Sequence, residues 1–407
     1  MSARRKTTVA VIFGGRSVEH DVSIITGSQI MRAFDPARYD VAAVYITRDG
    51  RWFTGEPLKS LDSFTGDVTS VKGVEPVVLS PSTQHHGLIV KPVTGLFQRA
   101  AVQRVDVLFP AVHGSHGEDG TLQGLFELAD IPYVGCGVLA SALANDKALT
   151  KVVLRQAGVP VVDDVVFTRA EWQDDAEAVL ARIEERLSFP LFVKPVTLGS
   201  SIGVGRVNDR ALLRATIEVA TSFDRRVIVE PAVVDCVEIN CAVMGDDTGL
   251  TASVLEQPKG WAEFLTYEDK YMRGGEGMKS AERLIPAPLS PEQTGRIQSL
   301  AKQAFAAIEG RGIARIDFLV RGDEVFLNEI NTMPGSLALY LWSETGMSSG
   351  DVVDRLVTLA QNAGAEKRRT SFDYQSNLVQ ITKQRGGLKG LKGSKSPAAP
   401  KPTPTNA

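Results

Sequence analysis

The sequence predicts a multidomain protein of the α/β and α+β classes, with a parallel sheet first, a small central domain next and a mixed sheet last. Three observations carry this prediction. The 407 residues, 43% hydrophobic and 23% charged, exceed what one compact core accommodates. A buried-type strand at residues 8–13 ends in Gly14-Gly15 and leads into a helical pattern. Residues 314–330 alternate between apolar and polar side chains, as a β-hairpin does.

Residues 1–139 are predicted to form the first domain. Expected strands alternate with expected helices, the strands at 8–13, 41–46 and 105–110 and the helices at 22–34 and 122–129. Such alternation is typical of a parallel sheet whose ligand site lies at the carboxyl ends of the strands. Gly14, Gly15 and His113 fall at that edge.

The rest of the chain is predicted to form two more domains and a tail. Residues 140–225 indicate a small α+β domain, with helices at 140–157, 172–187 and 209–222 and strands at 161–168, 191–195 and 202–207. Residues 226–370 begin with strands and continue with a helix at 291–309, a hairpin at 314–330 and a helix at 349–363. Residues 371–407 lose apolar periodicity and are predicted to be disordered.

Composition and charge exclude several classes of protein. The formal charge is −3, but the stretch from Lys383 to the end holds six cations and no acid, so the remainder carries −9. The net negative charge of this main part of the chain argues against a broad nucleic-acid-binding surface. No run approaches the roughly 18 apolar residues of a membrane span, and the first apolar run ends too early for a secretory signal. Three cysteines, an odd and small number, favour a reducing cytoplasm.

The segment 314–331 predicts a metal site. If residues 322–324 form a three-residue loop, Arg315 faces Asn331 and Asp317 faces Glu329, all on one side of the hairpin. The expected apolar side consists of Ile316, Phe318, Val320, Phe326 and Ile330. Two carboxylates and an amide oxygen are the hard donors that Mg²⁺ prefers. An ion-paired solvent face explains the same pattern equally well.

A glycine-rich loop with a neighbouring lysine predicts a phosphate site. Lys194 is followed by Gly-Ser-Ser-Ile-Gly at 199–203, where small residues let backbone N–H groups approach phosphate oxygens. The stretch lacks the Gly-Lys-Ser/Thr of a P-loop and the Gly-x-Gly-x-x-Gly of a dinucleotide site. A glycine-rich hairpin without a ligand has the same composition.

Six motifs occur in order over some 300 residues. They are Phe-Gly-Gly-Arg-Ser-Val-Glu-His-Asp-Val-Ser at 13–23, His-Gly-Ser-His-Gly-Glu-Asp-Gly-Thr-Leu-Gln-Gly at 113–124, Asn-Asp-Lys at 145–147, Lys-Pro at 194–195 with the loop at 199–201, Lys-Tyr at 270–271 and the hairpin at 317–331. Together they resemble the D-alanine–D-alanine ligases of the ATP-grasp superfamily. The resemblance covers most of residues 8–365.

The resemblance implies an enzyme that joins two D-alanines through an acyl phosphate, consuming ATP, for peptidoglycan precursor synthesis. It also implies two Mg²⁺ ions, with Mn²⁺ as an alternative, and a cytoplasmic homodimer that acts on small molecules and binds no nucleic acid. The alternative is a related ligase that joins D-alanine, or another small amino acid, to a different acceptor.

The resemblance implies roles for particular residues. The expected nucleotide contacts are Lys147, Lys194, Ser200, Ser201, Glu230, Glu238 and Lys270. The expected metal ligands are Asp317, Glu329 and Asn331. Glu19 matches the carboxylate that binds the first D-alanine's ammonium, and His113 lies near its carboxylate. The remaining catalytic positions are Arg315 and the Gly335 N–H at the oxyanion, with Ser200 and Tyr271 linked to Glu19.

One stretch departs from the family pattern. Most of these ligases have a serine after the metal hairpin that meets the second substrate's carboxylate, and this chain has Tyr340 there. A phenol still donates one hydrogen bond, but it is bulkier and reaches further. The departure leaves the identity of the second substrate open.

Other interpretations compete with these roles. Glu19 also suits a helix start near the dipole, and Tyr271 alone suits a surface aromatic. His113 and His116 lack two further ligands at zinc spacing. A catalytically silent ATP-binding regulator would not need the full set of charged residues. A nicotinamide-dependent dehydrogenase is suggested only by Gly14-Gly15, without the third glycine.

Overall fold

The computed structural model describes residues 5–92, 100–199, 201–259, 283–371 and 378–384. It divides into two compact units, Met1–Gly364 and Ala365–Ala407. The first unit contains three sheets. None of the described helices is both long and apolar enough to cross a lipid bilayer.

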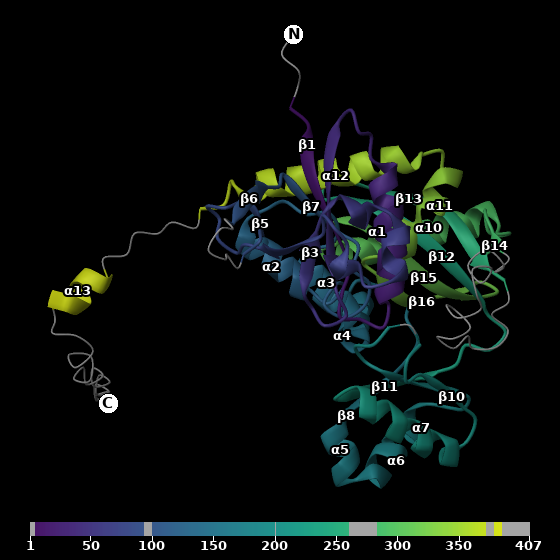
Figure 1. Cartoon of the computed structure of the whole chain (residues 1–407). Helices are drawn as coiled ribbons and strands as arrows, with labels where there is room; N and C mark the ends of the chain where they lie inside the picture. The colour runs from purple at the N-terminus through teal and green to yellow at the C-terminus, as the bar shows by residue number, and fades with distance from the viewer. Residues whose placement is uncertain (1–4, 93–99, 200, 260–282, 372–377, 385–407) are drawn as a thin grey trace, which may run out of the picture. The chain divides into compact units, whose positions relative to one another are not determined.

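The first sheet has seven strands in the order β6-β5-β4-β3-β2-β1-β7. Figure 1 labels β1, β3, β5, β6 and β7 of this sheet. Its strands are β1 (Thr7–Gly14), β2 (Tyr39–Ile46), β3 (Trp52–Thr54), β4 (Glu75–Leu79), β5 (Gly87–Val90), β6 (Ala101–Arg104) and β7 (Val107–Pro110). Only β1 pairs in parallel, with β2 and β7, and the pairs from β2 to β6 are antiparallel. The sheet is therefore mixed, because short strands between residues 52 and 104 extend it beyond the predicted parallel part.

The end of β1 directs the chain toward the candidate site. Val9 to Phe13 are fully buried, and α1 (His20–Ala33) packs against the strand. Gly14 has a φ of +87°, and a Cβ there would lie 2.2 Å from the Ile46 carbonyl oxygen of β2. Only glycine allows this close turn. At the next residue, the Gly15 carbonyl oxygen lies 2.7 Å from the imidazole Nδ1 of His20.

The central sheet has four antiparallel strands in the order β10-β9-β11-β8. They are β8 (Val165–Thr168), β9 (Leu191–Pro195), β10 (Gly205–Val207) and β11 (Arg226–Pro231), accompanied by α5 (Arg169–Asp174), α6 (Ala176–Arg186) and α7 (Arg210–Phe223). Strand β9 has the predicted bounds. Apolar side chains of these strands and helices form a separate core cluster.

Two predicted helices are each divided in two by an aspartate. The expected helix at 140–157 is α3 (Val138–Asn145) followed by α4 (Lys147–Gln156), and the Asp146 carboxylate accepts the Leu149 N–H at 3.0 Å. The expected helix at 172–187 is α5 followed by α6, and Asp175 accepts the Ala178 N–H at 2.9 Å. Aspartate competes for backbone donors and so begins a new helix instead of continuing one.

The third sheet has five strands in the order β14-β13-β12-β15-β16, and every pair in it is antiparallel. The predicted mixed sheet is therefore wrong for this part of the chain. Its strands are β12 (Val237–Asp246), β13 (Gly249–Pro258), β14 (Arg283–Leu284), β15 (Gly312–Arg321) and β16 (Glu324–Asn331), with helices α10 (Pro291–Ala307), α11 (Leu339–Glu344) and α12 (Ser349–Lys367).

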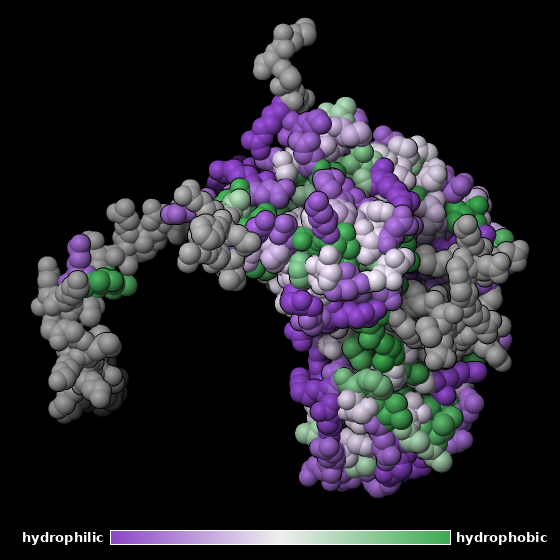
Figure 2. Space-filling model, viewed as in Figure 1, coloured by the Kyte–Doolittle hydropathy of each residue, from purple (hydrophilic) through white to green (hydrophobic). Residues whose placement is uncertain are grey.

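In the described part of the first unit, the remaining helices are α2 (Thr121–Ala129) and four short 3₁₀ helices. In the predicted tail, residues 378–384 form α13 (Leu378–Gln384), and the other residues after 371 lie outside the described ones. Figure 2 shows apolar residues gathered near the position of α4, where Leu149 and Val152 are 50% and 58% exposed.

Candidate active site

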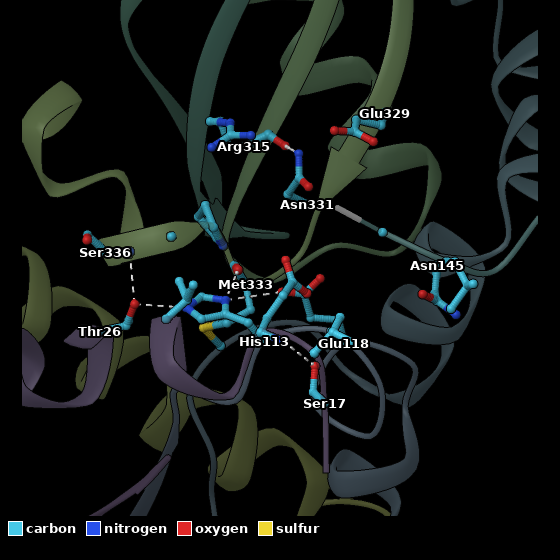
Figure 3. A pocket seen from close by; sticks show the side chains of 18 of the residues that line it. Ser17, Thr26, His113, Glu118, Asn145, Arg315, Glu329, Asn331, Met333 and Ser336 are labelled. Atoms are coloured by element: carbon cyan, nitrogen blue, oxygen red, sulfur yellow. Dashed lines mark hydrogen bonds and ion pairs between the residues drawn. The ribbon is translucent and has the colours of Figure 1, made fainter. Parts of the chain in front are cut away.

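A cavity of about 1020 Å³ lies among loops and strand ends of all three sheets in the first unit. It is lined by the loop after β1, the loop after β7, residues 197–199 and 202 at the glycine loop, and β12, β13, β15 and β16. A second cavity of about 50 Å³ shares Glu118, Asn145, Gly199, Glu329 and Asn331 with it. The two cavities therefore form neighbouring parts of one candidate site (Figure 3).

The hairpin of β15 and β16 carries the predicted metal ligands. The predicted pairs Arg315–Asn331 and Asp317–Glu329 both occur. The predicted three-residue loop is wrong, because Arg321 pairs with Glu324 across a two-residue turn. A two-residue turn alone would put Asp317 and Glu329 on opposite faces. A β-bulge after Asp317 shifts the register by one residue, so both carboxylates lie on one face.

The bulge also changes which side chains fill the core. On the turn side of the bulge, Val325 and Leu327 are buried and Phe326 is only partly buried, so the prediction for Phe326 is wrong. Gly322 has a φ of +56°, which a two-residue hairpin turn requires at its first position. The turn therefore sets the register near its own end, and the bulge sets it near the site.

Arg315 and Asp317 form a buried pair. The Arg315 Nε and Nη2 donate to the two Asp317 carboxylate oxygens, each at 2.7 Å, and the Asn331 amide nitrogen donates to the same carboxylate at 2.9 Å. Asp317 is 1% exposed, and burial raises its pKa, with Glu329 and Glu256 raising it further against the opposing effect of Arg315. We call Arg315, Asp317, Glu329 and Asn331 the carboxylate cluster. Its negative charges are held close together with only one cation among them.

A second cluster gathers lysines around one acid. Glu230 on β11 is 4% exposed, and its carboxylate contacts the Lys151 ammonium and, at 2.5 Å, the Lys194 ammonium. Burial alone would raise the pKa of Glu230, but the two lysines lower it to about 2. Lys147 donates to the Leu198 carbonyl oxygen at 2.6 Å, and burial lowers its pKa. We call Lys147, Lys151, Lys194 and Glu230 the lysine cluster.

The two clusters adjoin each other. Lys147 and Glu329 both line the smaller cavity, and the Lys194 ammonium donates to the Asn328 amide oxygen of β16 at 3.4 Å. Glu238, expected at the ribose, lines the larger cavity. Sequence reasoning missed Lys151, whose i, i+4 spacing from Lys147 on one helix was the available signal.

His113 is held by polar groups from three parts of the chain. Its Nδ1 lies 2.9 Å from the Met333 carbonyl oxygen and 3.3 Å from the Glu118 carboxylate, and its Nε2 lies 2.9 Å from the Thr26 hydroxyl (Figure 3). Burial alone would lower the pKa of His113, but Glu118, Glu19 and the Met333 carbonyl raise it. Burial and Glu19 raise the pKa of Glu118 in turn. Thr26 and Glu118 were not predicted as site residues.

Glu19 and Gly335 also line the larger cavity. Glu19 precedes α1, and its side chain makes no capping hydrogen bond to that helix. After Gly335, three consecutive residues, Ser336 to Ala338, have φ values near +50°. The Ser336 N–H donates to the Thr26 hydroxyl at 3.2 Å, which ties this strained turn to α1.

Tyr340 belongs to a network that the sequence did not reveal. Its hydroxyl donates to the Glu256 carboxylate at 2.7 Å, and Arg283 donates to the same carboxylate at 2.9 Å. The Asn240 amide lies 3.3 Å from it. Burial raises the pKa of Tyr340. Glu256 and Arg283 lie far from the recognised motifs in the sequence, so spacing gave no signal for them.

Three expected site residues, Ser200, Lys270 and Tyr271, lie outside the described residues. Ser201, next to the first of them, has a φ of +59°. Apart from Ser201, the other expected positions line the two cavities or belong to the clusters beside them. His116 has a φ of +68° in the loop after β7, and its N–H donates to Asp119 at 2.9 Å.

Comparison with known proteins identifies the family. The model of the D-Ala–D-Ala ligase N-terminus matches residues 8–136, and that of the D-Ala–D-Ala ligase C-terminus matches residues 153–358. D-alanine–D-alanine ligases of Heliobacterium modesticaldum and Thermosipho africanus are 40% and 36% identical to this chain. Each alignment covers 92% of the chain, and 100% and 98% of those proteins respectively.

Solved structures of similar fold are also named as ligases of D-alanine. The VanG D-Ala:D-Ser ligase of Enterococcus faecalis is 33% identical with a TM-score of 0.76, covering 88% of this chain and 100% of that one. The D-alanine–D-alanine ligase of Coxiella burnetii is 29% identical with a TM-score of 0.76, covering 94% and 99%. The predicted resemblance and ATP-grasp fold are confirmed, and the chain belongs to the D-alanine–D-alanine ligase family.

Proposed function

We propose that this chain is an ATP-dependent carbon–nitrogen ligase that joins two D-alanines into D-alanyl-D-alanine for peptidoglycan synthesis. One observation carries the proposal: the lysine cluster and the carboxylate cluster meet beside a single cavity that also contains Glu19, His113 and Gly335. Such a cavity offers positive charge for phosphates, hard oxygen donors for a metal, and polar groups for a zwitterionic substrate. Relatives that span nearly the whole chain carry the same activity in their names.

The lysine cluster suits the phosphates of ATP. Lys151 and Lys194 contact the single carboxylate of Glu230, and Lys147 adds a third ammonium group, so the cluster has an excess of positive charge. Lys147 and Lys194 would contact the phosphates, with the Ser200 and Ser201 loop beside them, as in the family. Glu238 and Lys270 would complete the nucleotide site. Glu230, with both carboxylate oxygens on lysines, would hold those lysines in place near the adenine segment.

The carboxylate cluster fits Mg²⁺. Among the described residues, no three His, Cys, Asp or Glu side chains come together as metal ligands, so the third donor here is an amide. Asp317, Glu329 and Asn331 are oxygen donors in the pattern that Mg²⁺ prefers. Burial, and after it the neighbouring Glu329 and Glu256, raise the pKa of Asp317, and a bound cation would favour its charged form. When bound, two Mg²⁺ ions, or Mn²⁺, would neutralise phosphate charge during transfer.

The reaction divides into two steps. A carboxylate oxygen of the first D-alanine attacks the γ-phosphorus of ATP, the bond to the ADP oxygen breaks, and an acyl phosphate forms. The amine of the second D-alanine then attacks the acyl carbon, loses a proton, and expels phosphate. Arg315 and the Gly335 N–H would stabilise the oxyanion of this second step, where one such donor contributes roughly 3–4 kcal/mol.

Glu19 and His113 would hold the first D-alanine. A carboxylate attracts the ammonium group, and a protonated imidazole attracts the carboxylate. The raised pKa of His113 favours the protonated form that this role needs. Tyr271 and Ser200 would link to Glu19 when the site closes, as in the family, and so exclude water from the acyl phosphate.

A second acceptor remains a candidate because Tyr340 replaces the usual serine. D-serine or another small amino acid could then serve in place of the second D-alanine, and one structural relative is named as a D-Ala:D-Ser ligase. We also propose a cytoplasmic homodimer without nucleic-acid partners, and domain boundaries at residues 139, 225 and 370.

The test measures phosphate release from ATP and Mg²⁺ with D-alanine, D-serine, D-lactate and L-alanine, with the products identified by mass. We expect release with D-alanine alone and a dipeptide of two alanines as the product. Release without any amino acid, or with L-alanine alone, would contradict the proposal. A mixed product with D-serine in preference to D-alanine would establish the second candidate instead.

A further inference from the structure

Arg283 differs from Arg315 and Arg48, which also line the cavity. Arg315 directs its Nε and Nη2 at Asp317, and Arg48 donates to Asp21 at the exposed surface at 2.8 Å. Arg283 instead donates one amino group to Glu256, a 1% exposed side chain that lines the same cavity. A guanidinium carries five N–H donors, and this contact occupies only part of them.

The guanidinium of Arg283 is fixed on an edge and on a face. Glu256 Oε1 holds the edge at 2.9 Å, and the Tyr340 ring lies under the face with a centroid distance of 4.7 Å. The Tyr340 hydroxyl donates to the other oxygen of Glu256 at 2.7 Å, which closes a three-membered network. Such a guanidinium loses little freedom when a further anion binds, and so it is preorganised.

The same network decides what Tyr340 does. Its hydroxyl proton is used by Glu256, so this hydroxyl is not the donor that a serine at this position offers to a substrate. The position nevertheless lines the cavity, as does Arg283. Charge interactions connect Tyr340 with Arg315, which places the network beside the expected oxyanion site.

We propose that Arg283 binds the carboxylate of the acceptor amino acid, and that Glu256 and Tyr340 are positioning residues that hold its guanidinium in the cavity. This inference rests on the proposed ligation. The acceptor carboxylate takes no part in bond formation, since only its amine attacks the acyl phosphate. Arg283 therefore selects acceptors that carry a free carboxylate, and it replaces the hydroxyl that this chain lacks.

The test is a competition between D-alanine and D-alaninamide as acceptors, with ATP, Mg²⁺ and D-alanine as the donor. D-Alaninamide has no carboxylate to phosphorylate, so it enters only as the amine. Both acceptors attack the same acyl phosphate, and the ratio of dipeptide to dipeptide amide, measured by mass spectrometry, reports acceptor selection. This ratio is independent of the total activity and of the affinity for ATP.

We expect the wild-type preference for the carboxylate to fall roughly 10- to 100-fold in Arg283→Gln, the range of a charge-assisted hydrogen bond. Tyr340→Phe keeps the ring under Arg283 but removes the bond to Glu256, so the preference should fall by a smaller factor, about threefold to tenfold. If Arg283→Gln does not fold, the product ratio of Tyr340→Phe tests the proposal by itself.

Arg48→Gln is the matched control, because it removes an arginine from the same cavity. Its product ratio should equal that of the wild type. An unchanged ratio in both Arg283→Gln and Tyr340→Phe overturns the proposal, and so does an equal fall in Arg48→Gln, which would indicate a general positive field. A wild-type enzyme that forms neither product would instead overturn the proposed ligation itself.

Discussion

The lysine cluster and the carboxylate cluster lie side by side but carry opposite excess charge. The lysine cluster contains three ammonium groups and one carboxylate, whereas the carboxylate cluster contains two carboxylates and one guanidinium. Buried charges that are unequal in number raise the free energy of a protein unless a ligand balances them. The difference therefore indicates what each cluster lacks: an anion in the first and a cation in the second.

The two clusters also differ in how their acids are held. Both oxygens of Glu230 are engaged by lysines, and the residue is outside the cavity lining. Glu329 lines both cavities. Glu230 therefore acts as a structural counter-ion, whereas Glu329 lies where a ligand in either cavity would meet it. The following substitutions separate these two uses of a carboxylate.

The largest effect is expected for Glu329→Gln, which removes a hard anionic donor while preserving side-chain shape. We expect D-alanine-dependent phosphate release to fall by about 10³-fold or more, because the metal that offsets phosphate charge is lost. The matched control is Glu324→Gln on the same strand, where the carboxylate is exposed and pairs with Arg321. Near-normal release in Glu329→Gln would refute the assignment of metal ligands.

The next effect concerns stability. Glu230→Gln leaves Lys151, which is 4% exposed, without its counter-ion, and we expect the free energy of unfolding to fall by about 3–5 kcal/mol. Urea denaturation at neutral pH measures the change. Glu56→Gln, which removes an exposed pair with Lys59, should change it by less than about 1 kcal/mol. Equal effects of the two substitutions would mean that the lysine cluster contributes no special stability.

The pH dependence of that difference is a separate test. The pKa of Glu230 is lowered to about 2 in the folded chain, so its contribution is present above its ordinary pKa and is lost as the pH falls toward 2. The stability difference between wild type and Glu230→Gln should therefore narrow from about pH 5 to about pH 3. A constant difference over this range would contradict the lowered pKa.

A smaller effect is expected for Glu118→Gln. Glu118 offsets the burial that alone would lower the pKa of His113, so its removal should lower that pKa. The raised pKa keeps His113 protonated to higher pH, so the rise of the D-alanine KM with pH should begin at a lower pH in the variant than in the wild type. The KM for ATP should be unchanged. An identical pH profile would remove His113 from substrate binding.

The sequence predicted the elements that long patterns define. Strand β9 and the helices α1, α7, α10 and α12 lie close to their expected positions because apolar periodicity runs through each. It missed β3 to β6, which are three to five residues long and offer too short a pattern. It merged helices at Asp146 and Asp175 because a cap and an interior aspartate look alike in sequence.

The hairpin shows both the strength and the limit of such reasoning. The facing pairs Arg315–Asn331 and Asp317–Glu329 were predicted correctly, but from the wrong loop. Sequence alone does not distinguish a three-residue loop from a two-residue turn combined with a bulge. Both place one more residue between the facing pairs than a two-residue turn alone would. The Glu256–Arg283–Tyr340 network was beyond reach because its members lie on β13, β14 and α11, which only the fold brings together.

The most direct test of the proposed ligation follows an oxygen atom. D-Alanine labelled with ¹⁸O in its carboxylate is incubated with ATP and Mg²⁺, and the released phosphate is analysed by mass. If the carboxylate attacks the γ-phosphorus and phosphate leaves on amine attack, one labelled oxygen per turnover appears in phosphate. Label in AMP, or unlabelled phosphate beside the dipeptide, would contradict the acyl-phosphate route.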